Sequence, residues 1–115
     1  MKVTRVYADD QGESHFEETD IPLNDAGEIG RLSEPMPAKA IIFRENEPGY
    51  DYDWHNAPRR QYIVLLDGVI EIEVSTGERR TFRGGDILLV EDTVGKGHRT
   101  RHVEPNKRRS LFIAI

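Results

Sequence analysis

The sequence contains no cysteine, a single tryptophan and only two methionines. Without cysteine the chain can form no disulfide, no thiolate metal site and no cysteine nucleophile. Its longest apolar run is far shorter than the roughly 20 residues that a membrane-spanning helix needs. The opening stretch "MKVTRVYADD" also lacks the apolar segment of a secretory signal peptide. These absences predict a soluble, cytoplasmic protein.

Basic residues are also fewer than acidic ones, with 16 Lys and Arg against 21 Asp and Glu. The formal net charge is −5 and the sequence pI is about 5.4, which argues against nucleic acid or an anionic membrane as the main partner. A length of 115 residues with 37% hydrophobic residues fits one domain that buries a core. We therefore expect a single domain over residues 1–115 whose partner is a small-molecule ligand.

Sustained helical periodicity is absent, and short strand patterns take its place. Apolar and acidic residues alternate over 69–74, which is the period-2 pattern of a sheet with one wet face. The first two expected strands form a hairpin over residues 2–18 around the turn "DDQG", and residues 21–37 are interpreted as a loop. Further strands are expected at 38–45, 61–66, 69–74, 79–82, 87–90, 98–103 and 110–115.

Many short strands separated by regular turns predict an all-β fold, a closed barrel or jelly roll. The positions expected to point into its core are apolar and follow the period-2 pattern. They are Ile63, Leu65, Ile70, Ile72, Val74, Leu88, Val90, Phe112 and Ile113. The clusters "GERR" and "NKRR" are interpreted as solvated turns.

The stretch "DYDWHNAPRRQY" carries the spacing of a known motif. The first motif of small cupins is G-x5-H-x-H-x3-E-x6-G. Gly49 and His55 match it, Ala57 stands at the second His, Gln61 stands at the Glu, and Gly68 closes it. Every interval is kept, while two of the three ligand positions have changed.

The second cupin motif is matched more loosely. Gly85 opens it, but Glu91 replaces its Pro and Thr93 replaces its Gly. His98 then comes about two residues late, and His102 falls near the usual Asn. With both motifs, residues 38–104 resemble a single-domain cupin with an altered metal site.

This resemblance implies a double-stranded β-helix, or RmlC-like jelly-roll barrel, with its site inside. It also implies that His55, Gln61 and His98 are the metal ligands, and His55 and His98 the candidates for catalysis. Small cupins often pair as homodimers, so the hairpin over residues 2–18, with its exposed edges, is expected at a dimer interface.

The chemistry of this ligand set can be argued from the residues. Two imidazoles and an amide oxygen suit Fe, Ni, Zn, Mn or Cu rather than Mg or Ca. Because all three ligands are neutral, the metal should be weakly held. The alternative is a metal-free pocket in which His55 and Gln61 only make hydrogen bonds.

Other residues of the same stretch are candidates for substrate binding. Arg59 and Arg60 could grip a carboxylate or phosphate, or could instead be exposed charges that pair with nearby acids. The remaining candidates for substrate contact are Trp54, Tyr62 and His102. Strand parity with His55 predicts that Asp51 and Asp53 point inward and Trp54 outward.

Two classes of function stay open. A metal-assisted enzyme of the isomerase, epimerase, lyase or dioxygenase type would act on a small polar, acidic metabolite. A non-catalytic module would bind or sense such a ligand without turnover. The enzyme is favoured, because nothing in the sequence indicates an attached signalling or DNA-binding domain.

Overall fold

The computed structural model describes all 115 residues, and nearly all regular structure in it is β-strand. The strands are β1 (Lys2–Ala8), β2 (Ser14–Asp20), β3 (Asn24–Asp25), β4 (Arg31–Leu32), β5 (Ala40–Asn46), β6 (Asp51–His55), β7 (Gln61–Leu65), β8 (Val69–Val74), β9 (Arg79–Arg83), β10 (Ile87–Val90), β11 (His98–His102) and β12 (Arg108–Ala114). One 3₁₀ turn, η1 (Gly27–Ile29), is the only helix, so no helix is long enough to cross a membrane.

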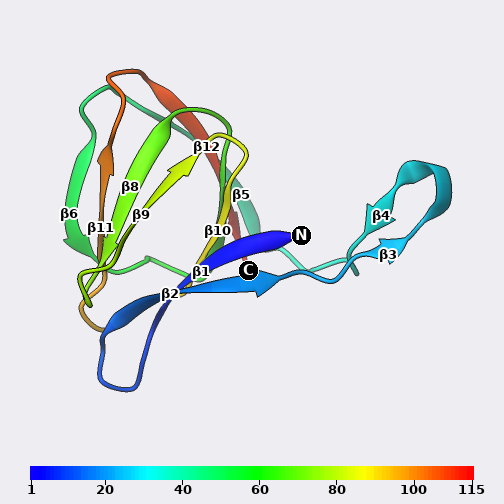
Figure 1. Ribbon diagram of the computed structural model, residues 1–115, viewed down its shortest axis with the longest axis horizontal. Helices are drawn as coiled ribbons and strands as arrows, with labels where there is room; N and C mark the ends of the chain where they lie inside the picture. Colours follow the sequence, from blue (N-terminus) through cyan, green and yellow to red (C-terminus); the bar gives the residue numbers. More distant parts are fainter.

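Two sheets close into a jelly-roll barrel (Figure 1). The larger has six strands in the order β2-β1-β10-β7-β12-β5, and the smaller has four in the order β6-β11-β8-β9. Every pairing within these two sheets is antiparallel except that of β1 with β10. The all-β jelly-roll class predicted from the turn spacing is confirmed.

The core lies between the inner faces of the two sheets. The alternation on β8 predicts it correctly, since Ile70, Ile72 and Val74 are buried while Glu71 pairs with Arg101 on the outer face. The predicted core residues on the large sheet are likewise buried, and these are Leu65, Leu88 and Val90.

Three positions of the predicted core differ in depth. Ile63 is partly buried and packs against the core cluster. Phe112 is half-buried and faces an internal cavity. The prediction for Ile113 is wrong, because neighbours on a strand point to opposite faces and Ile113 lies on the outside of the large sheet beside Val64.

Residues 21–37, interpreted as loop, contain a small hairpin. β3 and β4 pair with each other and with no other strand, and η1 forms the tip between them. This arm projects away from the barrel in Figure 1, and nearly all of its side chains are exposed. A two-stranded ribbon of this length has no core of its own.

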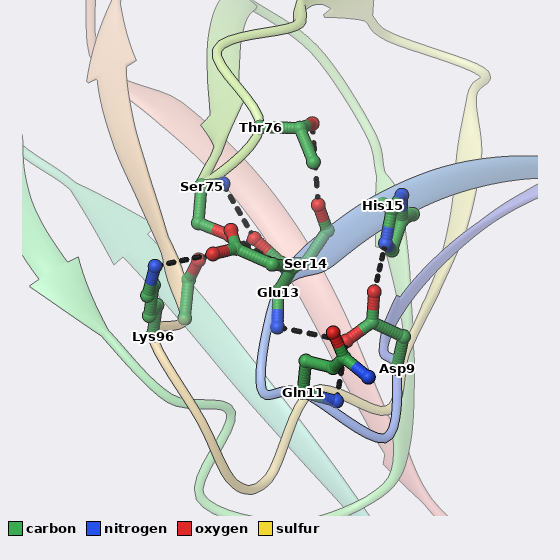
Figure 2. Close-up of polar contacts among 9 residues, drawn as sticks. Asp9, Gln11, Glu13, Ser14, His15, Ser75, Thr76 and Lys96 are labelled. Carbon is green, nitrogen blue, oxygen red and sulfur yellow. Dashed lines mark hydrogen bonds and ion pairs between the residues drawn. The ribbon is translucent and has the colours of Figure 1, made fainter.

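The N-terminal hairpin is fastened to the barrel by a polar cluster (Figure 2). Ser14 and Ser75 exchange hydrogen bonds of 2.6 and 2.7 Å between backbone N–H groups and hydroxyls, and Ser75 also donates to Glu13 at 2.6 Å. Glu13 forms an ion pair with Lys96, and the Ser14 hydroxyl donates to the carbonyl of Gly97 at 2.6 Å. The hairpin therefore holds the loop that leads into β11.

Candidate functional site

The barrel encloses a cavity of about 320 Å³. Its walls are aliphatic and come from both sheets, namely Ile63, Ile70, Ile72, Leu88 and Val90. Polar side chains are restricted to a few positions along it. A mostly apolar cavity with a small number of fixed polar groups is the usual form of a small-molecule site.

Two histidines meet at one end of this cavity. His55 ends β6 and His98 begins β11, and the two residues are direct partners in the antiparallel ladder. Their ring centroids are 4.5 Å apart. The His55 Nδ1–H donates to the carbonyl of Asp53 at 2.8 Å, and the His98 Nδ1–H donates to Asp92 Oδ2 at 2.5 Å. Both rings are thus oriented through Nδ1, and each Nε2 is left without a partner in the chain.

Asp92 orients His98 from a buried position. It is fully buried, and its backbone carbonyl accepts the N–H of Ala57 at 3.1 Å. Asp92 therefore joins the loop that precedes β11 to the turn that follows β6, while its carboxylate holds His98. Burial holds the pKa of His55 below its ordinary value, which favours the neutral imidazole.

The third predicted ligand lies in the same cavity. Gln61 is only 2% exposed, and its Oε1 has no hydrogen-bond partner. Ala57, at the altered His position, is also buried and lines the cavity. The structure brings His55, Gln61 and His98 to one cavity, but no three His, Asp or Glu side chains are arranged to hold a metal.

The predicted inward direction of Asp51 and Asp53 is wrong. His98 pairs with His55, but Thr100 pairs with Tyr52, so two residues of β6 lie opposite one residue of β11 between these pairs. This bulge shifts the parity of β6, and Tyr52 lines the cavity together with His55. Asp51 lies on the charged outer face of the small sheet.

The two arginines of the motif lie outside the cavity. Arg59 and Arg60 are exposed in the turn before β7. The Arg60 Nε donates to Glu91 at 2.6 Å, as expected of an exposed charge with a nearby acid. Neither residue lines the cavity.

Trp54 and Tyr62 also lie away from the cavity. Trp54 is exposed on β6, as the sequence predicts. Tyr62 points to the outer face of the large sheet, where its hydroxyl is 3.5 Å from the sulfur of Met36 in the arm.

A second polar group lies at the other end of the barrel, where sequence reasoning singled out only His102. It consists of Arg44 on β5, Tyr50 before β6, His102 at the end of β11 and Arg108 at the start of β12. The ring of Tyr50 is 5.8 Å from the ring of His102 and 5.3 Å from the Cζ of Arg108. Arg44 and Tyr50 line the cavity.

The interpretation of "NKRR" as a solvated turn is wrong for Arg108, which is 1% exposed. Burial and the charge of Arg44 lower the pKa of Arg108 to about 10. Burial also lowers the pKa of Arg44. The pKa of His102 is lowered by burial and by the charges of Arg108 and Arg44. The inward alternation of the last strand, continued back from Phe112 through Ser110, would have identified Arg108.

Comparison with known proteins places the chain among cupins in fold. No family model matches it. It is 30% identical over 84 residues to the oryzines biosynthesis cluster protein J of Aspergillus oryzae, and 27% identical over 86 residues to a cupin-domain-containing oxidoreductase of Neurospora crassa. Each match covers 70% of this chain but only 44% of the relative, so the chain spans less than half of their length.

A solved structure gives the same fold. The cupin domain of Schizosaccharomyces pombe Cnp3 matches with a TM-score of 0.53 at 13% identity, over 99% of this chain and 84% of that one. At this identity the likeness concerns the fold alone. The resemblance drawn from the motif spacing is confirmed as a small cupin fold.

Proposed function

We propose that this chain, a small cupin, binds a small organic molecule in its barrel and acts on it with a divalent transition metal held by His55, His98 and Gln61. The observation that carries the proposal is the shared orientation of the two imidazoles. A metal-ligating histidine usually donates its other ring N–H to a carboxylate or a backbone carbonyl, and both His55 and His98 do so.

The residues fit such an ion as a weak site. Two Nε2 atoms and the unpartnered Oε1 of Gln61 are donors that suit Fe, Ni, Zn, Mn or Cu. No carboxylate belongs to this set, because Asp92 is bound to His98. A divalent ion held there would polarise a ligand oxygen or activate a coordinated water.

The side chains of the protein supply the rest of the site. The aliphatic walls exclude water, which strengthens polar interactions inside the cavity. Asp92 holds the Nδ1 proton of His98, which keeps the Nε2 lone pair of this ring directed to the ion. The Neurospora crassa relative is named an oxidoreductase, which supports an enzymatic role.

Metal uptake tests the proposal directly. Untagged protein is titrated with Co²⁺, followed by visible absorption, and elemental analysis gives the ion-to-chain ratio. We expect one ion per chain, and no saturable uptake by His55→Ala or His98→Ala. His15→Ala is the matched control, because His15 lies at the protein surface beside Asp9 and should not affect binding. Equal uptake by His98→Ala and the parent would contradict the proposal.

A metal-free binding module is the second candidate. The observation that favours it is the pair Ala57 and Gln61, which stand where the resemblance expects His and Glu and leave only two imidazoles in the cavity. A chain that takes up no Co²⁺ but is stabilised by small molecules would select this candidate.

We further propose that the chain forms a homodimer through the outer face of its large sheet. This face carries exposed apolar residues on β5, where Phe43 is 80% exposed, and it continues through Leu66 and Leu111. Met1 and Val3 of the N-terminal hairpin line an adjoining apolar groove with Met36 of the arm. A second copy is the occupant that can also cover the coreless β3–β4 arm.

Light scattering checks the dimer at micromolar concentration. We expect twice the chain mass for the parent and a folded monomer for Phe43→Asp, since a charge in an apolar interface costs several kcal/mol when buried. Val94→Asp is the control, because Val94 is an exposed apolar residue in the loop between β10 and β11. A monomeric parent at high micromolar concentration would contradict this proposal.

A further inference from the structure

We propose that Arg108 and Arg44 bind the carboxylate of the ligand, at the end of the barrel opposite the histidine pair, and that the ligand is an amphipathic organic acid. The inference rests on the proposed function for the presence of a small ligand. Beyond that function, it specifies where the carboxylate of the ligand binds and what kind of carbon skeleton the ligand has.

Arg108 is the first support. The three guanidinium nitrogens of Arg108 are all buried, and none has a hydrogen-bond partner in the chain. Buried polar atoms are rarely left unpaired in native proteins, and a guanidinium stays charged under ordinary conditions. Gly68 packs closely against this side chain. A Cβ at position 68 would lie only 2.7 Å from the Cβ of Arg108. The fold therefore keeps a charged donor group in place without giving it an acceptor.

The neighbours of Arg108 add positive charge and further unpaired atoms. Both ring nitrogens of His102 and the Oδ1 of Asn46, the ladder partner of Arg108, are buried without a partner. Tyr50 and Asp67 raise the pKa of Arg108, and the Asp67 carboxylate is bound to the backbone and side chain of Arg109. No carboxylate of the chain neutralises this group.

Arg44 lines the cavity, whereas Arg108 and His102 do not, so Arg44 connects the group to it. Its Nε donates to the Ser110 hydroxyl at 3.2 Å, and its Cζ lies 4.3 Å from the ring centre of Phe112 and 5.7 Å from that of Tyr50. These contacts fix the guanidinium plane, and no carboxylate of the chain raises the pKa of Arg44. Carboxylate and phosphate both match the geometry of such a fork. The mostly apolar cavity favours the carboxylate, because it carries less charge to bury than a phosphate does.

The body of the ligand follows from the space between the two polar ends. β11 runs from the histidine pair at the lower end of the barrel in Figure 1 to the start of β12 at the upper end. The walls between these ends are the aliphatic residues of the cavity and Phe112. A sugar or another polar metabolite would leave hydroxyls unpaired there, so an aliphatic or aromatic body is favoured.

Thermal-shift and calorimetric titrations of the full chain test the proposal. The probes are hexanoate and phenylacetate, with hexanamide and phenylacetamide as neutral counterparts and inorganic phosphate as a second anion. We expect both acids to raise Tm by several degrees in a saturable manner, because they bind only the native state. The amides should bind at least tenfold more weakly. Equal binding of acids and amides, or a response to phosphate alone, would overturn the proposal.

Variants assign the binding to the arginine group. Arg108→Met should abolish the response to acids while leaving the Tm without ligand equal or higher, because it removes a buried charge that has no partner. Arg109→Met, one position along the same strand but exposed and paired with Asp67, should keep the full response. Should Arg108→Met fail to fold, Arg44→Gln must show the same loss. A full response to acids in the folded arginine variants would refute the inference.

The same titration in His98→Ala separates this inference from the proposed metal chemistry. A parent that takes up no Co²⁺ while His98→Ala still responds to acids would remove the metal chemistry and leave the carboxylate site standing. A parent that takes up Co²⁺ but does not respond to either acid would remove the carboxylate site and leave the metal chemistry standing.

Discussion

Asp92→Asn is expected to lower the affinity for Co²⁺ by about 10- to 100-fold, the range typical of losing a group that orients a metal-ligating histidine. In the parent the Asp92 carboxylate can only accept from His98 Nδ1, which leaves the lone pair on Nε2. An asparagine side chain can turn its nitrogen toward the ring instead. Nδ1 would then accept, the proton would move to Nε2, and that atom could no longer bind a metal.

Two measurements check this prediction. Calorimetric titration with Co²⁺ gives the affinity, and nitrogen chemical shifts of the imidazoles give the tautomer of His98 whether or not a metal is bound. Asp9→Asn is the matched control, since Asp9 makes the corresponding contact of 2.7 Å to His15 at the surface. An unchanged affinity together with an unchanged His98 tautomer would mean that Asp92 does not orient the ligand.

The barrel could be predicted from the sequence because strand alternation and turn residues are local. Ile70, Ile72 and Val74 follow the period-2 rule, and their burial is as the pattern indicates. The rule fails on β6, where one extra residue between Tyr52 and His55 reverses the inward face of Asp51 and Asp53. A bulge depends on pairing with a distant strand, and no local signal marks it.

The histidine end of the site could be predicted from the sequence, because the spacing of a motif reflects the fold that the motif belongs to. The resemblance implies that His55 and His98 share one site, and the structure makes these two distant residues direct ladder partners. The arginine end was not predicted, since Arg44 and Arg108 belong to no motif and charged residues are usually exposed. The alternation of β12 would have placed Arg108 on the inner face, but its complete burial follows only from the closing of the barrel.

Gly97→Ala is expected to have the largest effect on stability, a loss of about 3 kcal/mol or more. Gly97 has φ of +75°, which costs an L-residue roughly 1–2 kcal/mol. A Cβ there would also overlap the backbone carbonyl of His55, and it would lie 2.5 Å from the carbonyl carbon and 3.1 Å from the N of Asn56. All of these atoms are backbone, so β6 and β11 would have to separate where the two histidines meet.

Gly77→Ala isolates the effect of the overlap from that of the dihedral angle. Gly77 has φ of +93°, but a Cβ there would meet nothing within 4 Å, so this variant should lose only the roughly 1–2 kcal/mol of strain. Urea unfolding of both variants gives the two losses, and Co²⁺ titration of the folded fraction should show impaired binding for Gly97→Ala alone. Equal stability of the two variants, with Co²⁺ binding intact in both, would mean that the contact between Gly97 and His55 does not hold the two histidines together.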